Sequence, residues 1–132
     1  MEKIRIIIEK STDYYDAYAD NCDGIYGAGE TSEAAIEDAL RGLELYISSR
    51  EKKDLPAILQ EEYEIEYQYD TQSFLNYYNK IFTNAALERI TGINQKLLHH
   101  YSKGLKKPRT TQRKKIETAL HRLGNELLMT RL

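Results

Sequence analysis

The sequence of 132 residues contains one cysteine and no long run of apolar residues. Cys22 cannot form a disulfide within the chain, and it lacks the neighbouring His or Cys residues of a metal site. No apolar run approaches the roughly 18–20 residues of a membrane-spanning helix, and the run Ile6–Ile8 is flanked by charges, unlike a signal peptide. These absences predict a cytoplasmic protein with no membrane partner, no metal and no cofactor.

Charged residues make up 30% of the chain and are divided unevenly along it. Residues 1–70 contain 18 Asp and Glu against 7 Lys and Arg, a net charge of −11, whereas residues 71–132 contain 3 against 12, a net charge of +9. This asymmetry predicts two units with different partners. The basic half suits a polyanion, because each neutralised phosphate releases counterions, and the acidic half suits a basic protein. The alternative is that both are ordinary solvated surfaces.

The basic half has the periodicity of successive helices. Asp70 or Thr71 can cap a first helix, whose apolar face is expected to contain Phe74, Leu75, Tyr77, Tyr78, Ile81 and Phe82. A last helix, over about residues 111–128, is expected to bury Ile116, Ala119, Leu120, Leu123 and Leu127.

Between these lie two short helices joined by a tight turn. Thr83 can cap the first, and Gly92, which is free to take a positive φ, can end it. Asn94 can cap the second, and Gly104 can end it. The buried positions are expected to be Ala86, Leu87, Ile90, Ile93, Leu97 or Leu98, and Tyr101. Two short helices joined by a turn with a glycine form a helix-turn-helix unit.

About seven positions of this segment follow a known spacing. A small residue, Ala85 or Ala86, lies in the first helix, and an aliphatic residue follows the turn glycine. The further positions are Gln95, Leu98, Tyr101, Gly104 and Pro108. In these positions the segment resembles the lambda-repressor/Cro-like (XRE) family. The resemblance implies a DNA-binding domain that works as a dimer, since one recognition helix covers only a half-site. The apolar, tyrosine-rich remainder of the chain is the candidate for dimerisation.

Long polar side chains at the start of the second helix suit readout of base edges. Gln95 can bond adenine in bidentate fashion, and Lys96 can reach guanine. The residues one turn later can touch bases or phosphates, and the cations of the exit loop can position the DNA backbone. The candidate DNA-binding residues are Thr83, Asn94, Gln95, Lys96, His99, His100, Lys103, Lys106, Lys107 and Arg109. For each, the alternative is a solvated surface residue.

The acidic half alternates as strands do. Ile4, Ile6 and Ile8 indicate one strand, residues 14–19 a second, and residues 25–29 a third. Thr31 can cap a helix with apolar residues at helical spacing up to position 47, and a loop is expected at residues 51–56. A last strand, residues 63–69, has Tyr63, Ile65, Tyr67 and Tyr69 on one face. The order β-β-β-α-β predicts an α+β domain of residues 1–70, followed by an all-α helix-turn-helix domain of residues 71–132.

Several short sequence motifs in the acidic half also follow a known order. They are Tyr18-Ala19, Gly24 to Thr31 with Gly29-Glu30-Thr31 at its end, Glu33-Ala34-Ala35 and Ala39-Leu40. In these motifs the half resembles the HicB antitoxin family. The resemblance implies a degenerate ribonuclease-H-like domain that binds and blocks HicA, a small basic toxin that cleaves mRNA. Many such antitoxins carry a C-terminal DNA-binding domain and repress their own operon.

The two resemblances together predict a non-enzymatic antitoxin of a toxin-antitoxin pair that also represses its operon, as a homodimer or larger homo-oligomer. One alternative is a stand-alone regulator of the same fold without a toxin. The other is a metal-dependent nuclease, suggested by Asp13, Asp16, Asp20 and Asp23. Active ribonuclease-H sites gather carboxylates from different strands and a helix. Here the aspartates belong mostly to one strand and its turns, so we expect no catalytic residues.

Overall fold

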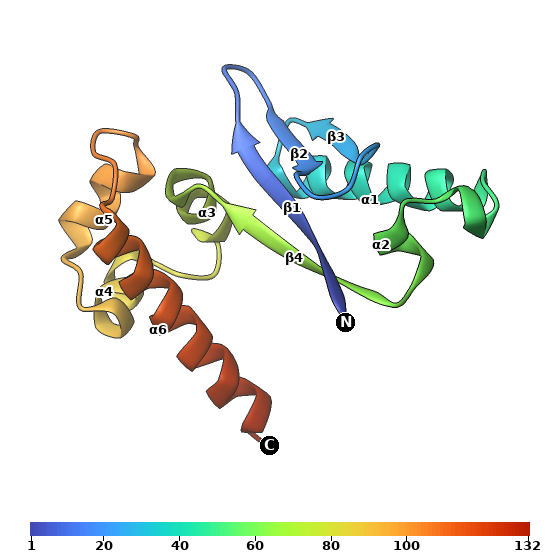
Figure 1. The fold of residues 1–132 in the computed structure, drawn as a ribbon. Helices are drawn as coiled ribbons and strands as arrows, with labels where there is room; N and C mark the ends of the chain where they lie inside the picture. Colours follow the sequence, from blue (N-terminus) through green and yellow to red (C-terminus); the bar gives the residue numbers. More distant parts are fainter. The chain divides into compact units, whose positions relative to one another are not determined.

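A computed structural model describes all 132 residues. The chain is of the α+β class, with one four-stranded sheet and a set of helices (Figure 1), which confirms the predicted class. It divides into two compact units, Met1–Ser73 and Phe74–Leu132. The sequence placed the boundary between residues 70 and 71, where helix α3 begins.

Unit 1 is built on a sheet with the strand order β3-β2-β1-β4. The strands are β1 (Glu2–Lys10), β2 (Tyr15–Ala19), β3 (Tyr26–Gly29) and β4 (Tyr63–Tyr69). Strands β1, β2 and β3 form an antiparallel meander, whereas β4 pairs with β1 in parallel. All four predicted strands are confirmed, and the three for which bounds were predicted, at residues 14–19, 25–29 and 63–69, agree within a residue at each end. Their order in the sheet was not predictable from the periodicity.

Helix α1 (Ser32–Ser48) lies across one face of this sheet (Figure 1). Thr31 Oγ1 accepts a hydrogen bond from Ala34 N at 3.0 Å, so the predicted N-cap is confirmed. A loop was predicted at residues 51–56, and this was wrong in part, because these residues contain a 3₁₀ turn, η1 (Lys52–Asp54). A short helix that was not predicted, α2 (Ala57–Gln60), follows, and its Leu59 is buried in the core.

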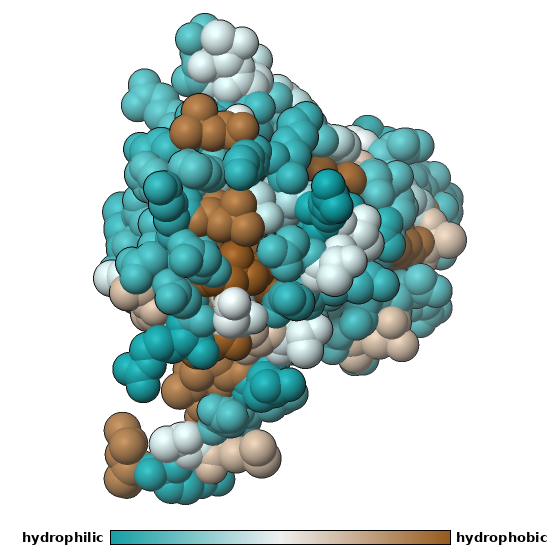
Figure 2. All heavy atoms as spheres, turned by 90° about the vertical axis from the view of Figure 1, so that its left-hand side faces the viewer, coloured by the Kyte–Doolittle hydropathy of each residue, from teal (hydrophilic) through white to brown (hydrophobic).

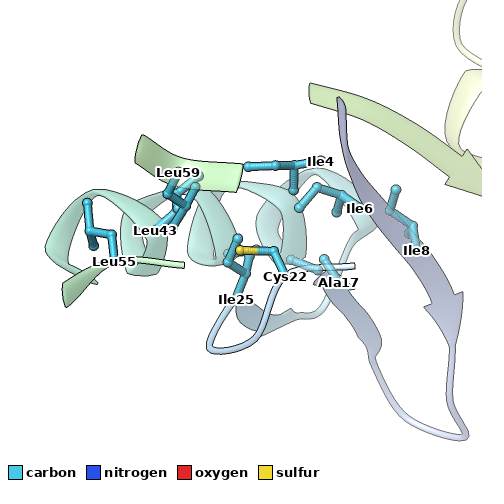
Figure 3. Packing of buried hydrophobic residues seen from close by; sticks show 11 residues of the cluster. Ile4, Ile6, Ile8, Ala17, Cys22, Ile25, Leu43, Leu55 and Leu59 are labelled. Atoms are coloured by element: carbon cyan, nitrogen blue, oxygen red, sulfur yellow. The ribbon is translucent and has the colours of Figure 1, made fainter. Parts of the chain in front are cut away.

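The core of unit 1 lies between the sheet and α1 (Figure 3). Ile4, Ile6 and Ile8 are fully buried and form its centre, as their alternation predicted. On β4, Tyr63, Ile65 and Tyr69 pack against the core, while 45% of Tyr67 is exposed; the four do not share one environment. The remaining buried residues are Ala17, Cys22, Ile25, Ala35, Ala39, Leu43, Leu55 and Leu59.

Four helices carry the second half of the chain: α3 (Thr71–Tyr78), α4 (Asn84–Thr91), α5 (Gln95–Ser102) and α6 (Thr110–Met129). Asp70 caps α3, since its Oδ1 accepts from the backbone N–H of Ser73 at 2.7 Å. The apolar face was predicted to continue through Ile81, but α3 ends at Tyr78 and Ile81 is 70% exposed. The amides of Ile81 and Phe82 both turn back to the Tyr78 carbonyl, which closes the helix.

The core of unit 2 gathers residues from all four helices. Its buried members are Leu75, Leu87, Ile93, Leu98, Tyr101 and Ile116. Leu98 is the fully buried residue of the predicted pair and Leu97 lies at the edge of the core. Leu127 was predicted to be buried, and this was wrong, because it is 62% exposed. The second half of α6 extends past α4 and α5 (Figure 1), so no helix of unit 2 covers it.

Candidate nucleic-acid interface

Helix α4 is held at both ends by the predicted caps. Thr83 Oγ1 accepts from Ala86 N at 3.0 Å, which satisfies one of the free amides of the first turn. Gly92 has a φ of 76° and its N–H donates to the Glu88 carbonyl. A side chain at this backbone conformation would be strained, whereas glycine adopts it freely. The chain therefore reverses direction within the few residues that separate α4 from α5.

The turn between the helices is fixed by three further side-chain contacts. Thr91 Oγ1 donates to the Leu87 carbonyl at 2.6 Å and accepts from Ile93 N at 3.0 Å. Asn94 Oδ1 accepts from Lys96 N at 2.8 Å, which confirms the predicted cap of α5. With Ile93 buried at the entrance of the core, these contacts set the angle at which α5 leaves the turn.

Glu88 supplies a contact that sequence reasoning missed. Its Oε2 accepts from the backbone N–H of Gln95 at 2.9 Å, seven residues later. The first two amides of α5 thus both have side-chain acceptors, one from Asn94 and one from α4. A carboxylate also stabilises the positive end of a helix. No local sequence pattern predicts this contact, because it depends on how the turn folds.

Helix α5 presents one polar face and one buried face. Leu98 and Tyr101 form the buried face, because both enter the core. Gln95, Lys96, His99 and Lys103 are exposed, and their spacing of three, four and seven residues places them on one continuous surface. His100 is half-buried at the edge of this surface.

The loop after α5 places cations beside the start of α6. Gly104, with a φ of 74°, turns the chain, and Leu105 N donates to the His100 carbonyl at 2.9 Å. Lys106, Lys107 and Arg109 are exposed and line a hollow of about 670 Å³ with Tyr101, Thr111 and Gln112. Arg109 is the N-cap of α6 and makes no capping hydrogen bond with its side chain. The first amides of α6 have no side-chain acceptor, and free amides at a helix N-terminus can bind an anion.

The cations of unit 2 have no acidic partners. All ion pairs of the structure lie between residues 5 and 66, within unit 1. Lys114, Lys115 and Arg122 line a second hollow of about 500 Å³ between α4 and α6. The positive charge near α5 is therefore not neutralised within the chain.

The sheet face of unit 1 that is turned away from α1 carries charged and tyrosine side chains. The guanidinium of Arg5 donates hydrogen bonds to Asp20 at 3.0 Å and to Glu66 at 3.2 Å. These bonds raise the pKa of Arg5, and the bond to Asp20 has the larger effect. Tyr26 donates its hydroxyl to Asp16 at 2.8 Å, which raises the pKa of Tyr26. Two of the four aspartates considered for a nuclease thus have separate partners, and no group of three or more His, Cys, Asp or Glu could hold a metal ion.

Comparisons with protein families, curated proteins and solved structures find no match to this chain. No helix is long and apolar enough to cross a membrane.

Proposed function

We propose that unit 2 binds duplex DNA as a helix-turn-helix module, with α5 in the major groove. The observation that carries the proposal is the exposed face of α5, with Gln95, Lys96, His99 and Lys103 on a helix whose start is fixed by two side-chain acceptors. A helix of this kind reads bases with the residues of its first turns. Gln95 suits adenine and Lys96 suits guanine.

The residues around α5 supply contacts to the DNA backbone. Lys106, Lys107 and Arg109 surround the uncapped start of α6, which favours a phosphate for its charge and for its acceptor oxygens. Thr83 accepts from Ala86 N and keeps its own hydroxyl proton for a phosphate oxygen. Asn94 uses Oδ1 as a cap and keeps its amide N–H₂ as a donor. These contacts add affinity and little sequence preference.

A binding assay on the DNA upstream of the reading frame tests this proposal. Affinity is expected to fall steeply as the salt concentration rises. Gln95→Ala should relax the preference at one base pair by about 1–3 kcal/mol. Lys107→Ala should weaken all sequences alike and reduce the salt slope by about 1.

Lys53→Ala is the matched control, because Lys53 is an exposed lysine of unit 1 that pairs with Glu51. It should leave DNA affinity unchanged. If the full chain binds no duplex even at low salt, the helix-turn-helix proposal fails.

We further propose that unit 1 is the partner-binding half of a cytoplasmic antitoxin of the HicB kind, with a degenerate ribonuclease-H-like fold. Support comes from the strand order with a parallel β4 beside β1, and from the net charge of −11 over residues 1–70. A small basic toxin like HicA has the complementary charge. The uncovered sheet face, with Asp16, Glu66 and Tyr26, offers carboxylates and aromatic rings to such a protein.

Co-expression with the protein of the neighbouring reading frame tests the toxin partnership. A small, basic neighbour that co-purifies with the tagged chain, and whose growth inhibition the chain relieves, is the expected result. A chain that purifies without a partner and still binds its promoter would instead identify a stand-alone regulator. A nuclease assay with magnesium or manganese should show no cleavage, and cleavage lost in Asp16→Asn would overturn the non-enzymatic proposal.

A further inference from the structure

A buried tyrosine at the end of α5 has a hydroxyl that makes no hydrogen bond within the chain. The ring of Tyr101 belongs to the core of unit 2, and only 5% of the residue is exposed. The hydroxyl of a buried tyrosine usually has a partner. No side-chain N or O atom of the chain is fully enclosed without a partner, so the hydroxyl of Tyr101 reaches the surface. Because Tyr101 lines the hollow of about 670 Å³ beside the loop after α5, its hydroxyl opens into that hollow.

The start of α6 adds free amides to the same hollow. The first hydrogen bond of this helix runs from Arg113 N to the Arg109 carbonyl, so the amides of residues 110–112 have no acceptor within it. The side chain of Arg109 does not cap them. Two of these residues, Thr111 and Gln112, line the hollow. Free amides at the positive end of a helix favour an anion.

Three cations complete the lining of the hollow. Lys106, Lys107 and Arg109 are exposed and make no ion pair, and no carboxylate lines the hollow. Figure 2 views the molecule from the side on which Figure 1 shows α5 and the loop after it, and hydrophilic side chains cover most of that face. The hollow thus combines one tyrosine hydroxyl, two free amides and three cations, and its ligand is a polar anion.

The number of donors distinguishes a phosphomonoester from the DNA backbone. A backbone phosphate is a diester with one negative charge and two unesterified oxygens. A phosphomonoester has a charge of about −1.5 to −2 at pH 7 and three acceptor oxygens. The donors and cations of the hollow exceed what a diester can use and suit the additional oxygen and charge of a monoester. The volume of about 670 Å³ lies within the range of about 300–1,000 Å³ for small-molecule sites, which leaves room for the esterified group.

We propose that this hollow, the Tyr101 hollow, binds a small phosphomonoester that competes with DNA. The hydroxyl of Tyr101 donates to one phosphate oxygen, and the amides and cations hold the others. This inference deepens the proposed function, and the competition rests on it, because Lys106, Lys107 and Arg109 are also the cations proposed to contact the DNA backbone. A phosphomonoester bound to these cations releases unit 2 from DNA.

Titration of the full chain with two phosphate esters tests the ligand class. The probes are glycerol phosphate, a monoester, and dimethyl phosphate, a diester, at constant ionic strength. The backbone amide NMR signals of Thr111 and Gln112 should shift and saturate with glycerol phosphate, which should bind at least about 10-fold more tightly than dimethyl phosphate, because it adds a charge-assisted hydrogen bond. Equal affinity for the two esters, or no saturation with glycerol phosphate, would overturn the proposal.

Two variants with matched controls test the lining. Tyr101→Phe keeps the buried ring and removes the hydroxyl, so it should stay folded and bind glycerol phosphate about 10-fold more weakly. Tyr14→Phe, which removes the hydroxyl of an exposed tyrosine of unit 1, should bind it like the wild type. Lys107→Gln should also weaken binding, whereas Lys80→Gln, which removes an exposed charge of unit 2 outside the hollow, should not. Unchanged affinity in folded Tyr101→Phe would overturn the assignment of the site.

DNA binding measured on the same samples separates this inference from the proposed function. Glycerol phosphate at constant ionic strength should lower the DNA affinity of the wild type more than that of Tyr101→Phe. A chain that binds glycerol phosphate and no DNA supports the phosphomonoester site and contradicts the proposed function. A chain that binds DNA and no glycerol phosphate contradicts this inference and leaves the proposed function in place. Binding of both ligands at once would overturn the competition.

Discussion

The contact between Glu88 and the start of α5 allows us to predict how much stability unit 2 loses when Glu88 is replaced. Helix α5 begins with three amides that have no partner inside the helix, at positions 95, 96 and 97, because the first intrahelical bond runs from Leu98 N to the Asn94 carbonyl. Glu88 accepts from the first of these amides and Asn94 from the second. Replacing Glu88 by alanine removes one acceptor and one favourable charge at the helix end.

The expected cost follows from these two losses. A carboxylate at a helix N-terminus is worth about 0.3–1 kcal/mol when exposed, and its hydrogen bond adds about 1 kcal/mol. Glu88→Ala should therefore destabilise unit 2 by about 1.3–2 kcal/mol, within the range expected for Asn94→Ala as a lost cap. In a domain of this size each kcal/mol lowers the melting temperature by about 4–8 °C. Glu88→Gln keeps an acceptor and loses the charge, so the stability of this variant should lie between those of the wild type and Glu88→Ala.

Amide hydrogen exchange provides a site-specific readout. In Glu88→Ala the Gln95 amide should exchange faster, while the Lys96 amide should stay protected, since Asn94 still accepts from it. In Asn94→Ala the two amides should behave in the opposite way. If Gln95 protection is the same in Glu88→Ala as in the wild type, the contact does not hold the start of α5, which would refute the prediction.

Three further predictions concern the backbone and the single thiol. Gly92→Ala should cost about 1 kcal/mol in urea unfolding, purely from its φ of 76°, because the added Cβ meets no atom within 4 Å, and Gly92→Asn should cost less. Gly27→Ala should cost about 3 kcal/mol or more in thermal unfolding, since its Cβ would lie 2.5 Å from the Ala35 backbone oxygen; a loss below 1 kcal/mol would contradict the close packing of β3 on α1. Burial, then Asp23, raises the pKa of the Cys22 thiol. Because the folded protein favours the protonated thiol, the thiol contributes its full stabilisation below its pKa in the unfolded chain, and this stabilisation is lost as the pH rises through its pKa in the folded protein. In Cys22→Ser the free energy of unfolding should therefore decrease less between neutral and alkaline pH than in the wild type.

The distribution of charge along the chain accounts for two proposed activities in two different units. Unit 2 has no ion pair of its own, whereas the ion pairs of unit 1 hold its carboxylates beside cations and tyrosines. Cations without internal partners are available to phosphates, and their affinity depends on salt. The full-length net charge of −2 conceals this division.

The sequence by itself determined the features that depend on near neighbours in the chain. Caps such as Thr31, Thr83 and Asn94 work within three residues of themselves, and Gly92 ends its helix through its own φ. Alternation and helical spacing likewise follow from the backbone geometry of a single element. The α+β class and the exposed face of α5 were therefore predictable.

The tertiary structure alone decided which elements meet. Strand β4 pairs in parallel with β1 because α1 and its return loop carry the chain back across the sheet, and no local pattern encodes that choice. Glu88 reaches Gln95 only once the turn is folded. Leu127 repeats the spacing of the buried residues and stays exposed, because α6 continues beyond the helices that would cover it. Periodicity shows which side of a helix is apolar, and only the packed structure shows how far along that side a partner extends.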